Sequence, residues 1–160
     1  MERKLSTIFA SDVVGFSKMM AANEEMTLKL LQQRRLVIDG VIAEHGGTIF
    51  GSAGDSVIAE FPSPIKATEC AVQMQGKMQA MNEDVPEERK MVFRVGINIG
   101  DVMVSQDNLY GDAVNIAARL EAEAKPDGIC ISKSVPDMVS RKIQVSYQDA
   151  GEHVVTNIQH

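Results

Sequence analysis

The chain has 160 residues, of which 44% are hydrophobic and none is Trp, and its formal net charge is -6. A chain of this length can form one domain that buries roughly 70% of the surface of its unfolded state. The excess of acidic residues argues against nucleic acid and anionic membrane surfaces as partners, because binding to them depends mainly on Lys and Arg.

The two cysteines, Cys70 and Cys130, lie in apolar stretches and lack the paired spacing of a zinc site or a disulfide framework. No uncharged stretch approaches the ~18 apolar residues of a membrane span. Asp12 interrupts the only run that resembles the start of a signal peptide. These features predict a cytoplasmic protein with no membrane contact within this segment.

Hydrophobic periodicity in the first third of the chain predicts a strand, a helix and a hairpin. Residues 5–14 are rich in Ile, Val and Phe, which is typical of a buried strand. Asn23 is a candidate N-cap for a helix of about 22 residues, and the glycines at 46–47 would end it. The segments 48–50 and 56–61 flank a tight glycine-containing turn and are predicted to pair.

The rest of the chain is predicted to alternate irregularly between helices and short strands. A second helix follows Pro64, and its stripe of methionines is interpreted as core packing. The remaining predicted elements are strands over 91–99, 102–104, 129–131 and 143–147, a helix over 112–124 and a short helix over 135–139. Strands joined by hairpins favour an α+β fold with a mixed, mostly antiparallel sheet covered by helices.

Two acids interrupt apolar strands beside glycines, namely Asp12 in IFASDVVGFS and Asp55 in IFGSAGDSVIAEF. A carboxylate in such a run is costly to desolvate unless it is paired, hydrogen-bonded or bound to a cation. Oxygen ligands on neighbouring strands suit Mg²⁺, which also holds substrate phosphates. Alternatively, both acids are ordinary turn or cap residues, and these two positions alone do not decide between the interpretations.

Gly15, Phe16 and Ser17 directly follow the first strand and precede a helix. Backbone N–H groups at such a turn commonly bind phosphate. A single glycine is a weak signal, however, and the phosphate-binding pattern GxxxxGK[ST] is absent.

The segment LYGDAVNIAARLE places Asn115 and Arg119 four residues apart, so both side chains project from one face of a helix. The alternative is a solvated polar face on which Arg119 pairs with Glu123.

Four motifs occur in order along the chain: SDVVGFS, GSAGDSVIAEF, FRVGINIGDV and YGDAVNIAARLE. Together they resemble the catalytic domain of class III nucleotidyl cyclases, the adenylate and guanylate cyclases. The resemblance covers residues 1–160, with an expected truncation at the C-terminus. It implies an α/β sandwich with a ferredoxin-like or polymerase-palm core, and a homodimer whose active sites lie between the two domains.

By this resemblance Asp12 and Asp55 bind the metals, with the carbonyl of Val13 as a further ligand. The implied cofactor is Mg²⁺ or Mn²⁺, two ions per active site. The implied reaction is attack of the ribose 3′-oxygen of ATP, or of GTP, on the α-phosphorus, with pyrophosphate as the leaving group.

The resemblance also assigns residues to the nucleotide. Gly15, Phe16 and Ser17 receive the triphosphate. Asn115 orients the ribose and Arg119 stabilises charge on the reacting phosphoryl group, and the partner subunit supplies both.

Four positions depart from common family patterns. Gly51 stands where many adenylate cyclases carry a base-reading Lys, and Asn108 replaces the usual acid or Thr of the base site. Asp101 and Thr156 stand where phosphate-binding Arg and Lys are common. We therefore expect weak discrimination between bases, with Asn108 in contact with the base and ATP preferred.

The leading hypothesis is thus an adenylate cyclase, and guanylate cyclase is the nearest alternative. A diguanylate cyclase is less consistent, because GSAGDSV lacks the second acid and the glycine pair of a GG(D/E)EF turn. A catalytically weak module for nucleotide binding or dimerisation is a third possibility, but such a module needs neither the two acids nor the Asn115 and Arg119 pair.

Overall fold

The computed structural model describes residues 2–106, 108–132, 145–150 and 153–158, which form a single mixed sheet with helices on both faces. The strands are β1 (Glu2–Val13), β2 (Thr48–Ala53), β3 (Ser56–Phe61), β4 (Phe93–Ser105), β5 (Asn108–Tyr110), β6 (Ile129–Ser132), β7 (Val145–Ala150) and β8 (His153–Ile158). Their order is β2-β3-β1-β4-β6-β8-β7, and β5 pairs with β4. Only the β4–β6 pairing is parallel among these strands. The fold class predicted from sequence is confirmed.

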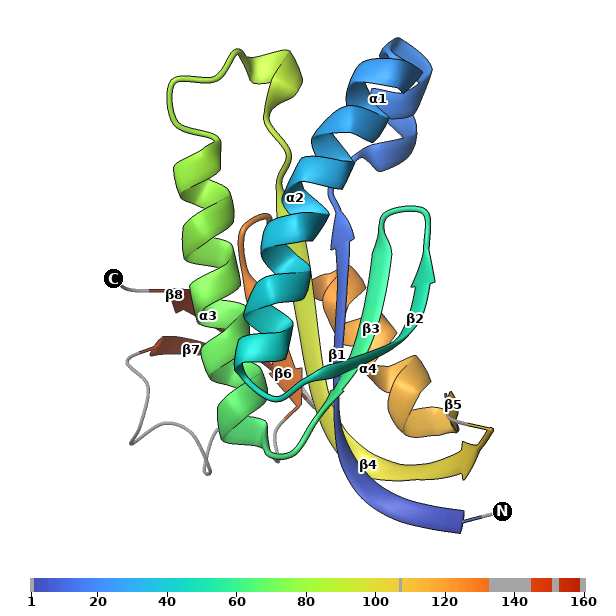
Figure 1. Ribbon diagram of the computed structural model, residues 1–160. Helices are drawn as coiled ribbons and strands as arrows, with labels where there is room; N and C mark the ends of the chain where they lie inside the picture. Colours follow the sequence, from blue (N-terminus) through green and yellow to red (C-terminus); the bar gives the residue numbers. More distant parts are fainter. Residues whose placement is uncertain (1, 107, 133–144, 151–152, 159–160) are drawn as a thin grey trace.

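Two layers of helices cover the sheet, with α2 and α3 on one face and α4 on the other (Figure 1). The helices are α1 (Phe16–Ala22), α2 (Glu24–Glu44), α3 (Pro64–Met81) and α4 (Asp112–Glu123), with a 3-10 turn η1 (Glu87–Arg89). Alternation along β1 separates the layers: Phe9 and Val13 join the core under α2 and α3, whereas Ile8 and Ala10 join the core under α4. Asp12 therefore lies on the α4 face.

The predicted long helices and the hairpin are confirmed. The Asn23 side chain accepts a hydrogen bond from the Met26 N–H at 3.0 Å and caps α2. The Ser63 hydroxyl caps α3 in the same way, at 3.2 Å from the Lys66 nitrogen. Met74 and Met78 are fully buried under the sheet, as the core interpretation of the methionine stripe requires.

Strand β4 runs without a break from Phe93 to Ser105, so the predicted separation of two strands at Gly100 and Asp101 is wrong. Leu5 and Ser6 of β1 pair with Asp101 and Gly100, and this pairing keeps the two poor strand formers in the sheet. Helix α1 and strands β5 and β8 were not predicted. The predicted helix over 135–139 lies outside the described residues, and β7 occupies 145–150 where a strand over 143–147 was expected.

Helix α4 lies directly on the backbone of β4. The residues of β4 that face α4 alternate along the strand and are polar or small: Arg94, Gly96, Asn98 and Gly100. A Cβ atom at Gly96 would lie 2.3 Å from the Ala117 carbonyl oxygen and 2.3 Å from the Glu121 nitrogen. Only glycine permits this close approach, and the Asn98 side chain adds a hydrogen bond of 3.1 Å to the Ala113 carbonyl.

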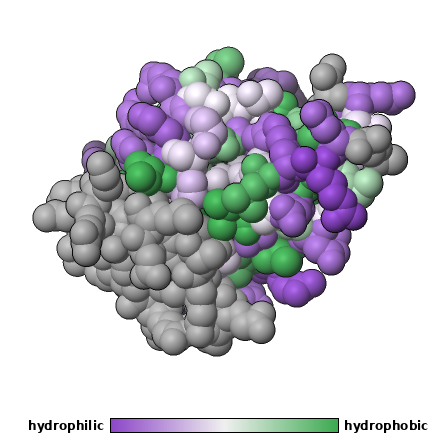
Figure 2. Space-filling view, turned by 90° about the horizontal axis from the view of Figure 1, so that it is seen from below, coloured by the Kyte–Doolittle hydropathy of each residue, from purple (hydrophilic) through white to green (hydrophobic). Residues whose placement is uncertain are grey.

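Seen from below, the molecule exposes apolar surface among hydrophilic side chains (Figure 2). Leu5, near the N-terminal end of β1, is 67% exposed and lines a hollow of about 390 Å³ with Pro62 and Ile99. This hollow lies at the end of β1 opposite Asp12. Among the described residues, no helix is both long enough and apolar enough to cross a membrane.

Candidate active site

Asp12 lies next to the last residue of β1 and is paired with Arg94 of β4. The two residues are direct cross-strand neighbours, so their side chains leave the sheet on the same face. Arg94 donates to both carboxylate oxygens, from Nε to Oδ1 at 3.1 Å and from Nη2 to Oδ2 at 2.9 Å. Hydrogen bonds to Asp12 raise the pKa of Arg94 above its ordinary value. This two-point contact fixes the plane of the carboxylate.

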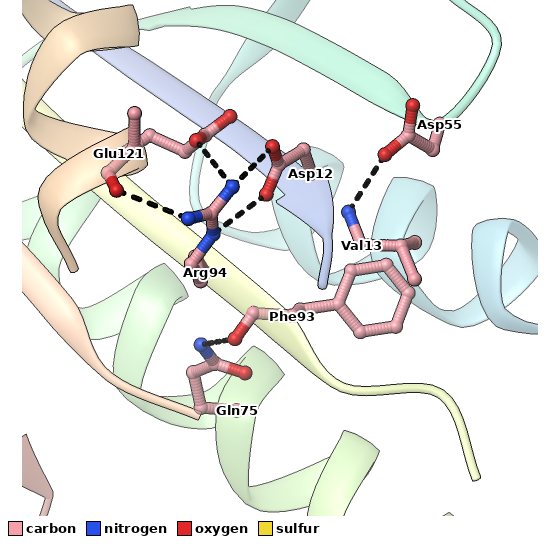
Figure 3. A network of polar contacts seen from close by, with 8 residues as sticks. Asp12, Val13, Asp55, Gln75, Phe93, Arg94 and Glu121 are labelled. Atoms are coloured by element: carbon pink, nitrogen blue, oxygen red, sulfur yellow. Dashed lines mark hydrogen bonds and ion pairs between the residues drawn. The ribbon is translucent and has the colours of Figure 1, made fainter. Parts of the chain in front are cut away.

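Arg94 also reaches the C-terminal part of α4, as Figure 3 shows. Its Nη1 donates to the Ala122 carbonyl at 3.0 Å, and its Nη2 lies 3.6 Å from a carboxylate oxygen of Glu121. Glu121 is only 7% exposed, and burial together with the neighbouring Asp12 raises its pKa from 4.5 to about 8. Glu121 therefore holds its proton to a higher pH than an ordinary glutamate does.

Asp55 belongs to the tight turn between β2 and β3. Its Oδ2 accepts a hydrogen bond of 2.9 Å from the Val13 N–H, which brings the turn to the end of β1 beside Asp12 (Figure 3). Gly54 has a φ of 58°, a left-handed conformation that glycine adopts easily. The structure thus brings together the two acids that the sequence singled out.

Two carboxylates suit a magnesium site that is completed by water and phosphate, rather than a site in which protein side chains supply every ligand. Within the described part of the chain, no group of three or more His, Cys, Asp or Glu side chains is placed to hold a metal ion. Mg²⁺ usually keeps several waters and takes one or two carboxylates together with substrate phosphates. A carboxylate has about four lone-pair sites, so Asp12 retains acceptor capacity beside its bonds to Arg94. The residues therefore fit a divalent ion that is shared with a phosphate.

The predicted phosphate turn begins α1. Gly15 occupies the N-cap position with a φ of 67°, and no side chain caps this helix. The first N–H groups of a helix have no partner within the helix. Phe16 packs against the core under α2 and α3, and Gly15 and Ser17 are exposed beside the end of β1.

Asn115 and Arg119 occupy the exposed face of α4. Ala113, Ala117 and Glu121 of the same helix are buried against the sheet. Arg119 is two residues from Glu121, which is about 200° around the helix axis. Among the described residues Arg119 forms no ion pair, so the alternative pairing with Glu123 is absent. The structure therefore does not bring Asn115 and Arg119 to the acids of their own chain.

The four positions that differ from common family patterns all lie in strands. Asn108 is half-buried at the start of β5, and its Oδ1 accepts a hydrogen bond of 3.0 Å from the Leu109 N–H. Gly51 pairs with Ile58 at a register shift in the hairpin. Asp101 is exposed on β4, and Thr156 pairs with Ile129 in β8.

Sequence reasoning missed Arg94 and Glu121. Both stand within the motifs FRVGINIGDV and YGDAVNIAARLE, but neither residue has a local partner that would mark it. The available signal was the alternation in FRVGINIG, where Arg94 shares one strand face with Gly96 and Asn98. That face opposes α4, and a charge on a covered face requires a partner.

The sheet carries Asp12 and Asp55 at the end of β1, hereafter the acid end, and comparison with known proteins identifies the class of this domain as nucleotidyl cyclase. The family described as "Adenylate and Guanylate cyclase catalytic domain" matches residues 2–157, and the chain belongs to this family. "Putative adenylate cyclase 3" of Rhizobium meliloti is 42% identical over 98% of the chain, and an adenylate cyclase of Streptomyces coelicolor is 29% identical over 88%. The chain spans 27% and 35% of the length of these two relatives.

A solved structure agrees with this assignment. An adenylate/guanylate cyclase/hydrolase from Silicibacter pomeroyi superposes with a TM-score of 0.91, at 35% identity and with 99% of each chain covered. The family resemblance inferred from the four motifs is therefore confirmed.

Proposed function

We propose that this domain is an adenylate cyclase that converts ATP to 3′,5′-cyclic AMP and pyrophosphate for intracellular signalling. The observation that carries the proposal is the division of the site residues within one chain. Asp12 and Asp55 meet at the end of β1, whereas Asn115 and Arg119 face away from them on α4. A complete site then requires the α4 face of a second copy, as in a symmetric homodimer.

In the proposed mechanism the bond from the ribose 3′-oxygen to the α-phosphorus forms as the bond to pyrophosphate breaks. Asp12, Asp55 and the Val13 carbonyl would hold two Mg²⁺ or Mn²⁺ ions. When bound, these ions would neutralise the phosphates and acidify the 3′-hydroxyl, whose proton would pass to solvent water.

The other residues position the nucleotide. N–H groups of Gly15, Phe16 and Ser17 bind the triphosphate, Asn115 of the second copy orients the ribose, and Arg119 stabilises the reacting phosphoryl group. Such a cation contributes about 10²–10³-fold to turnover.

The test is direct identification of products. The purified 160-residue chain is incubated with ATP or with GTP in the presence of Mn²⁺, and the nucleotides are separated by chromatography. We expect cyclic AMP from ATP, with less cyclic GMP from GTP. Cyclic GMP as the main product would replace the proposal with a guanylate cyclase. A folded dimer that converts neither nucleotide would favour a module that only binds nucleotide or dimerises.

Base selection is proposed to involve Asn108. Its amide oxygen already accepts from the Leu109 N–H, so its NH₂ group is the donor left for a base. Both adenine and guanine carry ring acceptors, and such a contact separates them poorly. We expect Asn108→Asp, which keeps the acceptor but removes the donor, to change the ratio of kcat/KM for ATP and GTP by about tenfold or more. An unchanged ratio would place base selection elsewhere.

A cytoplasmic location is part of the proposal. Cys70 and Cys130 are free thiols and both are buried, which is consistent with a reducing compartment.

A further inference from the structure

Arg94 contacts three groups that belong to two different parts of the candidate site. Its guanidinium binds both oxygens of Asp12, the carbonyl of Ala122 and, at a longer distance, Glu121. We propose that Arg94 is a positioning residue, which holds the Asp12 carboxylate in its metal-binding orientation and anchors it to the C-terminal turn of α4. This inference rests on the proposed metal site and adds a residue that the motif assignments did not include.

Asp12 and Arg94 contact each other at two points. Asp12 and Arg94 are directly opposed on β1 and β4, and their side chains are 21% and 25% exposed. A carboxylate at a strand end has two free torsions, and a two-point bond to a planar guanidinium removes both. A ligand that is already oriented loses less conformational freedom when it binds a metal.

Arg94 is itself held in place by α4. The third guanidinium nitrogen donates to the Ala122 carbonyl, so the side chain of Arg94 is held at its far end as well. Below this contact, the Gly96 backbone lies against Ala117 and Glu121 and leaves no space for α4 to shift toward the sheet. Asp12 is thus oriented by the backbone of α4, through Arg94.

The opposite role for Arg94 is competition with the metal for Asp12. The positive charge of Arg94 lies beside Asp12 and within electrostatic range of Asp55. If the charge were its main effect, Arg94→Met would tighten metal binding, because it leaves the acids more negative. If orientation dominates, the same substitution weakens metal binding. The two roles therefore predict opposite signs.

The experiment measures Mn²⁺ affinity directly, by the electron paramagnetic resonance signal of free Mn²⁺, in the parent chain, Arg94→Met and Arg94→Lys. Lys keeps the charge but offers one point of contact, so we expect both variants to bind Mn²⁺ about 10- to 100-fold more weakly. In turnover assays, both variants should need a higher Mn²⁺ concentration to reach half of their maximal rate. Most of kcat should be recovered when Mn²⁺ is saturating.

Lys4→Met is the matched control, since it removes an ion pair with Glu60 on the same sheet, far from Asp12. It should leave Mn²⁺ affinity unchanged. Circular dichroism reports folding, and Arg94→Lys tests the proposal if Arg94→Met does not fold. If Arg94→Lys binds Mn²⁺ as tightly as the parent chain or more tightly, while Asp55→Asn still binds Mn²⁺ weakly, the positioning role of Arg94 is overturned and the proposed metal site stands. Unchanged Mn²⁺ binding in Asp55→Asn overturns the proposed metal site and, with it, this inference.

Discussion

The acid end of β1 and the outer face of α4 contrast in how far their polar groups are satisfied within one chain. At the acid end Asp12 has Arg94 as its partner and Asp55 has the Val13 N–H, and the side chains of both acids are half-buried. On the outer face Asn115 and Arg119 are exposed, and Ile116 between them is 36% exposed. The side chains of the first region have partners within their own chain, whereas those of the second region point outward from it.

The largest expected effect separates metal binding from folding at the acid end. Asp55→Asn keeps an oxygen acceptor for the Val13 N–H but loses the charge, so activity should fall by about 10³-fold while the melting temperature barely changes. Asp12→Asn should lose activity and also lower the melting temperature, because it removes the charged partner of Arg94. Activity assays and thermal melts check both, and a mostly active Asp55→Asn would contradict the metal assignment.

The next prediction tests whether the outer face of α4 serves the second copy. Arg119→Ala should reduce turnover by about 10²–10³-fold and leave stability unchanged, since Arg119 is exposed. In a co-expressed mixture with Asp55→Asn, each heterodimer would contain one intact site, which should restore about a quarter of parent activity. Tagged heterodimers that stay inactive would argue against shared sites.

The smallest effect concerns the pH dependence of stability at the acid end. The pKa of Glu121 rises from 4.5 to about 8, so the folded state holds a proton that the unfolded state has lost. The stabilisation is complete below about pH 4.5 and is lost as pH rises toward 8. Glu121→Gln should remove this decline, which we expect to be on the order of 2 kcal/mol.

Urea unfolding at pH 5 and pH 9, in metal-free buffer, measures this difference. Glu60→Gln is the matched control on β3: burial opposes ionisation of Glu60, but hydrogen bonds from Lys4 and Ser6 lower its pKa on balance. Its effect should therefore not change between these two pH values. An equal decline in the parent and in Glu121→Gln would contradict the protonated state of Glu121.

Local signals predicted much of the fold. Asn23 and Ser63 cap their helices as their residue types suggest, and the hairpin forms around its glycine turn. The break expected at Gly100 and Asp101 did not occur, because pairing with β1 outweighs local propensity. The seven-residue α1 offered too short a pattern to be recognised.

For the candidate site, the sequence predicted which residue types matter but not all of their partners. Asp12 and Asp55 were found because a charge in an apolar strand is unusual, and they do meet at the end of β1. Arg94 is 82 residues from Asp12 along the chain, and only the sheet register reveals that they are opposed. Long-range pairing of this kind leaves no trace in a local window.

The contact between Gly96 and α4 has a consequence for which substitutions this chain can accept. At Gly96 the main chain of β4 meets the main chain of α4, so at this point backbone atoms set the distance between sheet and helix. Residues on the outer face of α4 can therefore change without altering that distance. In the proposed symmetric dimer, one methyl group at position 96 would displace two residues at once: Asp12 in one proposed site and Arg119 in the other. A library that diversifies this strand should keep glycine at this position.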